Sequence, residues 1–137
     1  MEPWQLWQDM ARESEQAGRL AEDGGCPRSA ASRYYYAAYQ AATALLLYRH
    51  LTPPEGREAW GHFDTPALLQ DQLRALTRSA DLRNDLTRRL RELYRLRLDA
   101  DYSGLLPVVA GQAAAAGKDS RSLLGVVDKF LPKGVTP

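Results

Sequence analysis

Charged side chains that could form a site recur at helical spacing near the middle of the chain. Arg95 and Arg97 each precede an aspartate by four residues, Asp99 and Asp101, which places each pair on one helix face. This arginine-first order adds only roughly 0.2–0.5 kcal/mol, and carboxylates are unfavourable at a helix C-terminus. Three alternatives follow for the two aspartates: they contact the N-terminus of another helix, they pair with arginines elsewhere, such as Arg33, or they serve a functional site.

Three consecutive tyrosines form a second unusual feature. Tyr34, Tyr35, Tyr36 and the nearby Tyr39 lie in an alanine-rich segment, and three adjacent rings must point around most of a helix circumference. The small alanines allow neighbouring helices to approach closely beside them. One interpretation places the rings in the core with their hydroxyls at its rim. The other has one or two rings stack on a nucleic-acid base or contact a second subunit.

Other chemically active groups are few. A single cysteine, Cys26, excludes an internal disulfide and any site built from several thiolates. Two histidines argue against a multi-histidine metal centre, so the sequence predicts neither a metal nor a cofactor. His62 follows Trp60 in a predicted loop and is either a packed, hydrogen-bonded histidine or a catalyst. The spacing of Arg57 and His62, four residues between them, arises easily by chance.

The overall charge constrains the class of partner. The 137 residues carry 18 Lys+Arg and 17 Asp+Glu, and this balance argues against a strong nonspecific polyanion binder. Arginines greatly outnumber lysines, and arginine binds phosphate or carboxylate in a two-pronged geometry. Acidic residues dominate positions 1–25 and arginines dominate 82–98. These segments either attract each other or form two solvated faces. No secretory signal or membrane-length apolar run occurs, which predicts a cytoplasmic protein without a membrane partner.

The apolar periodicity is helical throughout. Predicted helices run from about Trp4 to Gly24, from Pro27 to about Leu51, from Thr65 to Leu76, from a cap at Asp81 to about Tyr102, and from Val109 to Leu131. No alternating strand pattern, repeat or linker interrupts them. We therefore expect one domain over 1–137 that is all-α, an antiparallel four- to five-helix up-and-down bundle, with a flexible tail at 132–137.

Two of these segments carry a family likeness. Residues 32–46, SRYYYAAYQAATALL, resemble the SRxYYA helix of small prokaryotic HEPN proteins. Residues 93–102, LYRLRLDADY, resemble the RxxADY signature at the fourth helix of the same group. His62 falls where these proteins usually have a histidine ahead of their third helix. Together the two motifs and the helical pattern cover nearly the whole chain.

The resemblance implies a compact bundle that forms a homodimer. HEPN proteins are often encoded beside a minimal nucleotidyltransferase, and several act as RNase toxins in toxin–antitoxin or defence systems. The RNase members use an Arg-x4-6-His element near this helix end. Arg97 matches its arginine, but Tyr102 stands where the histidine is expected. A phenol with a pKa near 10 is a poor general base at neutral pH.

Three hypotheses of function follow. The leading one is a nucleotide-, RNA- or partner-binding module with weak or no catalysis, whose site includes Arg33, Arg97, Asp101 and Tyr102. The second is a metal-independent RNase toxin in which His62, brought near Arg97 by the fold or by dimer symmetry, replaces the missing histidine. The third is a purely structural interaction adaptor.

Overall fold

The computed structural model describes residues 1–104 and 106–133, and within these ranges the chain is all-helical, as predicted. The helices are α1 (Pro3–Asp23), α2 (Pro27–Tyr48), α3 (Thr65–Leu76), α4 (Ala80–Tyr102) and α5 (Ala110–Phe130). Most of the tail predicted at 132–137 lies outside the described residues. In the part of the chain that is described, no helix has both the length and the apolar character needed to cross a bilayer.

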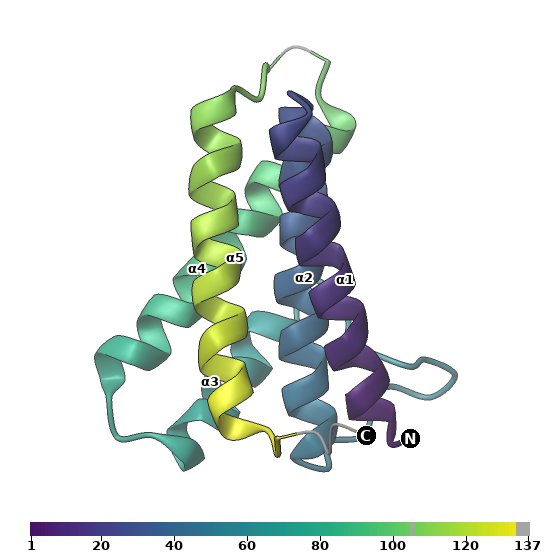
Figure 1. Ribbon diagram of the computed structural model, residues 1–137. Helices are drawn as coiled ribbons and strands as arrows, with labels where there is room; N and C mark the ends of the chain where they lie inside the picture. Colours follow the sequence, from purple (N-terminus) through teal and green to yellow (C-terminus); the bar gives the residue numbers. More distant parts are fainter. Residues whose placement is uncertain (105, 134–137) are drawn as a thin grey trace.

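The helices form a bundle around α2 (Figure 1). α1 and α2 run side by side in opposite directions, α5 lies alongside them, and α4 crosses behind at an oblique angle. The short α3 packs near the end of the bundle where α1 begins and α5 ends. α2 contacts each of the other four helices. This central position requires a slender helix, and α2 is accordingly rich in buried alanine.

Three helices, α1, α2 and α5, approach one another closely around the side chain of Tyr34. Its ring is fully buried and lies between Gly18 of α1 and Gly117 of α5. A Cβ added at Gly18 would lie 2.6 Å from the ring, and one at Gly117 would lie 2.8 Å from it. The Tyr34 hydroxyl donates a 2.6 Å hydrogen bond to Glu22. Burial and then this hydrogen bond raise the pKa of Tyr34 to about 12, so the phenol stays protonated. The core interpretation therefore holds for this tyrosine.

Two predicted helix ends differ from the structure. The fourth helix is capped by Ser79, whose Oγ accepts a 3.1 Å hydrogen bond from the Leu82 amide, so the prediction of an Asp81 cap was wrong. Asp81 instead lies within the first turn, where a carboxylate is favoured by the helix dipole. The second helix ends at Tyr48 rather than Leu51, because His50 adopts a φ of 66° that no helix continues.

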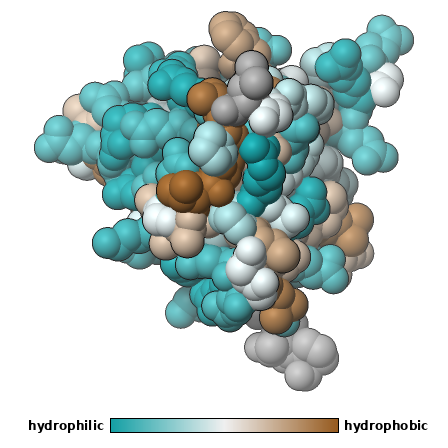
Figure 2. All heavy atoms as spheres, turned by 90° about the horizontal axis from the view of Figure 1, so that it is seen from above, coloured by the Kyte–Doolittle hydropathy of each residue, from teal (hydrophilic) through white to brown (hydrophobic). Residues whose placement is uncertain are grey.

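The end of the bundle opposite the chain termini carries exposed apolar side chains. Leu106 and Val109, in the connection between α4 and α5, are both about half exposed. Seen from above, apolar residues gather on this end among hydrophilic neighbours (Figure 2).

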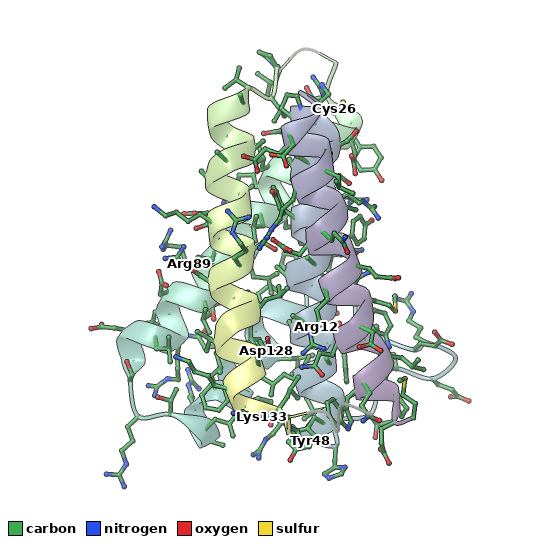
Figure 3. The ribbon with its side chains drawn as sticks, viewed as in Figure 1. Arg12, Cys26, Tyr48, Arg89, Asp128 and Lys133 are labelled. Atoms are coloured by element: carbon green, nitrogen blue, oxygen red, sulfur yellow. The ribbon has the colours of Figure 1, made fainter. Side chains whose placement is uncertain are left out.

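The acidic and basic segments do not neutralise each other within the chain. Arg12 of α1 lies 3.9 Å from Asp128 of α5, and the two point toward each other in Figure 3. Arg89 of α4 forms an ion pair with Asp119 of α5. Among the described residues no ion pair joins α1 to α4. The two segments therefore form separate faces, each paired locally or with α5.

Candidate functional site

The residues predicted for a site gather where α2 packs against the C-terminal end of α4. Arg97, Asp101 and Tyr102 come from the last two turns of α4, and Tyr36 meets them from α2. We refer to these four residues as the Arg97 cluster. Arg33, one turn before Tyr36 on α2, extends it, with its guanidinium carbon 5.0 Å from the centroid of the Tyr36 ring.

Arg97 is held between two phenols. Its side chain enters a largely buried position, and the residue is only 9% exposed. Its Nη2 donates to the hydroxyls of Tyr36 at 2.8 Å and Tyr102 at 3.2 Å. The guanidinium carbon also lies 5.2 Å from the centroid of the Tyr36 ring and 5.1 Å from that of Tyr102. Hydrogen bonds and cation–π contacts thus fix the guanidinium before any ligand arrives.

The remaining donors of Arg97 are incompletely used. Its Nε lies 2.9 Å from Oδ2 of Asp101, yet the N–H is not directed at that oxygen, and Nε is a buried donor without a hydrogen bond. The contact with Asp101 is therefore an ion pair rather than a hydrogen bond. Nη1 has no hydrogen-bond partner among the described residues. A fixed guanidinium with unused N–H groups is suited to an anion.

The two aspartates at the end of α4 have different surroundings. The predicted Arg97–Asp101 pair is present, and Ser32 of α2 also donates to Asp101 at 3.3 Å. The predicted Arg95–Asp99 pair does not form among the described residues. The last turn of α4 contains no basic residue of its own. Arg28 of α2 supplies a positive charge there, because it donates to the backbone carbonyls of Asp99 at 3.1 Å and Ala100 at 2.7 Å. No local pattern in the sequence indicates this contact, because the partners are 71 and 72 residues apart.

His62 lies beside the cluster in a stack of aromatic rings. Its Nδ1 is 2.5 Å from the hydroxyl of Tyr35, and its ring is nearly parallel to that of Tyr94 at 5.6 Å between centroids. The Tyr39 ring lies 4.5 Å from it on another side, and the Tyr39 hydroxyl donates to the carbonyl of Trp60. These contacts anchor the connection between α2 and α3 to the helix that carries Arg97.

The surroundings of His62 keep both it and Tyr35 uncharged. Burial raises the pKa of Tyr35 above its ordinary value of 10, so the phenol remains neutral at pH 7. Burial, followed by the positive charge of Arg97, lowers the pKa of His62 below 6.5, so the imidazole is neutral at pH 7. Because a hydroxyl both donates and accepts, the hydrogen bond between Tyr35 and Nδ1 is compatible with either tautomer of the imidazole. His62 is therefore a neutral imidazole with one ring nitrogen already engaged by Tyr35.

The fold brings His62 and Arg97 to the same tyrosine. The Tyr36 ring lies 6.0 Å from the His62 ring and contacts the Arg97 guanidinium on another side. The nearer arginine in sequence, Arg57, is exposed and makes no hydrogen bond to His62 among the described residues. Arg57 and His62 are thus not brought together as a unit, whereas Arg97 and His62 are neighbours through Tyr36.

No group of three or more metal-ligating side chains occurs among residues 1–104 and 106–133. Cys26 is exposed in the turn between α1 and α2, at the far end of the α1–α2 hairpin from the chain termini (Figure 3). The Arg97 cluster combines a fixed guanidinium, one exposed and one partly buried phenol and one carboxylate. This set of groups can bind an anion and stack on a ring.

Comparison with known proteins supports the fold. The chain matches the crystal structure of TT1696 from Thermus thermophilus with a TM-score of 0.72 and 22% sequence identity, over 96% of this chain and 100% of that chain. The shared architecture is therefore that of the whole bundle. No family model and no curated protein sequence matches the chain.

Proposed function

We propose that this chain is a HEPN-type module that binds a nucleotide or single-stranded RNA, with weak or no catalysis. The observation that carries the proposal is the guanidinium of Arg97, fixed by two tyrosine hydroxyls while its Nη1 makes no hydrogen bond among the described residues. Because the side chain is already ordered, binding a phosphate there costs little further conformational entropy.

The charge around the cluster favours an anionic ligand. Asp101 neutralises one positive charge, but Arg33 is exposed, forms no ion pair among the described residues and lies over the Tyr36 ring. The combined charge of Arg33, Arg97 and Asp101 is +1, which suits a single phosphodiester. Such a small net positive charge favours binding of nucleic acid at one position rather than along an extended basic surface.

Tyr102 supplies the surface for a base. The residue is 72% exposed although its hydroxyl is engaged by Arg97, so one face of its ring is oriented and open to solvent. Stacking of one base on such a ring contributes about 1–3 kcal/mol. Phosphate binding and base stacking can thus be combined within one nucleotide at this position.

Fluorescence anisotropy with a labelled single-stranded RNA oligonucleotide tests the proposal. Tyr102→Ala should weaken binding by about 5- to 150-fold, the equivalent of losing one stacked base. Arg33→Ala should weaken it as well, and both changes affect exposed residues that the fold does not require. Arg12→Ala removes an exposed arginine from α1 and should leave binding unchanged beyond the small effect of net charge. Equal affinities for all four proteins, or no binding by the wild type, would overturn the proposal.

A metal-independent RNase toxin is the second candidate, and the position of His62 and Arg97 on either side of Tyr36 favours it. It ranks second because Tyr102, a poor general base at neutral pH, stands where the expected histidine would be, and Nδ1 of His62 is already engaged by Tyr35. The RNase hypothesis expects growth arrest on expression that both His62→Gln and Arg97→Lys relieve. The binding-module hypothesis expects no growth arrest and intact RNA after incubation with the purified protein.

Two partners belong to the same proposal, a second copy of the chain and a minimal nucleotidyltransferase. The exposed Leu106 and Val109, in the connection that follows α4, support an interface at this end of the bundle. Light scattering after gel filtration should give about twice the chain mass of 15.3 kDa. Copurification with a transferase encoded by a neighbouring gene would identify the second partner.

If neither ATP nor RNA gives heat on titration, the adaptor hypothesis replaces this proposal.

A further inference from the structure

A pocket lined in part by His62 lies between the start of α3 and the C-terminal half of α4. Its volume is about 670 Å³, within the range of about 300–1,000 Å³ typical of small-molecule sites. We call it the α3–α4 pocket. The lining side chains include His62, Phe63, Arg91, Tyr94 and Arg95, with Leu98 beside them.

Two arginines of the α3–α4 pocket differ from the others on α4. Arg88, Arg89 and Arg97 all form ion pairs with carboxylates of α4 or α5. Arg91 and Arg95 are exposed, one turn apart, and have neither an ion pair nor a side-chain hydrogen bond among the described residues. Two guanidiniums on successive turns can together hold a phosphate, which accepts bidentate hydrogen bonds.

The rest of the lining is apolar and aromatic. Phe63 is 90% exposed, which is unusual for so large an apolar side chain, and it borders the pocket together with Tyr94 and Leu98. His62 stacks on Tyr94, and its Nε2 is the ring nitrogen that is not bonded to Tyr35. The pocket therefore combines ring surfaces and two cations, with Asp64 as the carboxylate among its lining residues.

We propose that the α3–α4 pocket binds one nucleotide unit, with its phosphate on Arg91 and Arg95 and its base against Phe63 and Tyr94. The inference rests on the proposed function, since it names where a single nucleotide is held beside the Arg97 cluster. The ligand must carry both a ring and a phosphate, because neither the cations nor the apolar wall alone fills the site. The size of the pocket admits a mononucleotide or one unstacked nucleotide of a strand and excludes a duplex.

Isothermal titration with AMP, adenosine and inorganic phosphate tests this inference. AMP should bind at least tenfold more tightly than adenosine or phosphate, because only AMP uses both halves of the pocket. The double variant Arg91→Ala/Arg95→Ala should weaken AMP binding at least tenfold. Arg88→Ala, an exposed arginine on the same helix that does not line the pocket, should leave it unchanged.

A negative charge introduced at the pocket rim provides a test that leaves the fold intact. Ala67 is exposed, lines the pocket and occupies the third position of α3, where glutamate is favourable for a helix. Ala67→Glu should therefore keep or raise stability and weaken AMP binding at least tenfold. No AMP binding by the wild type, or AMP binding unaffected by both Ala67→Glu and the double variant, would overturn the inference.

The pocket and the Arg97 cluster can fail separately. If RNA binding depends on Arg33 and Tyr102 but AMP does not bind, the proposed function stands and the proposal that the α3–α4 pocket binds a nucleotide is wrong. AMP binding that depends on Arg91 and Arg95, with RNA binding insensitive to Arg33→Ala and Tyr102→Ala, would keep the pocket and reject the cluster as the RNA site.

Discussion

Replacing Gly117 by alanine should test the packing of Tyr34 most sharply. A Cβ at Gly117 would lie 2.8 Å, 2.9 Å and 3.0 Å from Cζ, Cε2 and Oη of the Tyr34 ring. The ring cannot retreat, because Gly18 already lets α1 approach its other edge and leaves no space there. Either the ring or α5 must shift, and overpacking of a buried site costs about 1–3 kcal/mol.

Gly125→Ala is the matched control for this substitution. Gly125 lies in the same helix, is exposed, and has no atom within 4 Å of an added Cβ. Both variants gain about 1 kcal/mol of helix propensity, so the difference between them isolates the steric cost. We expect Gly125→Ala to raise the free energy of unfolding. The free energy of unfolding of Gly117→Ala should be lower than that of Gly125→Ala by about 1–3 kcal/mol.

Urea denaturation followed by circular dichroism at the helical band measures this difference. In a Tyr34→Leu background the ring is gone, so the penalty of Gly117→Ala should largely disappear, a coupling that only direct contact produces. Equal stability of Gly117→Ala and Gly125→Ala would refute the reasoning, as would a Gly117→Ala penalty that persists without the ring.

Three further predictions concern the helix ends and the partly buried His62. The pKa of His62 is lowered below 6.5 in the folded chain, so the unfolded chain binds more protons just below that pH. The free energy of unfolding should therefore fall as the pH decreases from about 7.5 to about 5.5. In urea titrations, His62→Gln should reduce that fall. Ser79→Ala should lower the free energy of unfolding by about 1 kcal/mol, and Ser79→Asp should change it little. If Asp81 were the cap, neither substitution would change the stability. Arg28→Ala should accelerate amide hydrogen exchange in the last turn of α4, and unchanged exchange would exclude its capping role.

The helices could be predicted because their signals are local. Apolar periodicity, Pro27 at a first turn and the glycines after α1 are all readable in short windows, and each marks an element present in the structure. The cap of α4 was predicted wrongly because Ser79 and Asp81 are both good capping residues two positions apart. Only the direction in which the chain enters the helix decides between them.

The site was only partly predictable, because most of its contacts join distant segments. The Arg97–Asp101 pair follows from a spacing of four on one helix and is present. The hydrogen bond from Arg97 to Tyr36 spans 61 residues, and the contact of His62 with Tyr35 spans 27. Both depend on how α2 packs against α4 and on the path of the α2–α3 connection. The α3–α4 pocket depends on the same packing, and no single motif marks it.

The salt dependence of RNA binding tests the central claim, that the Arg97 cluster and Arg33 bind the phosphate of a single strand. Each phosphate contact to a single strand adds about 0.7 to the slope of log affinity against log salt concentration. Arg33→Ala should therefore lower the slope by about 0.7 relative to the wild type, while Arg12→Ala should leave it unchanged. Identical slopes for all three proteins would contradict the claim.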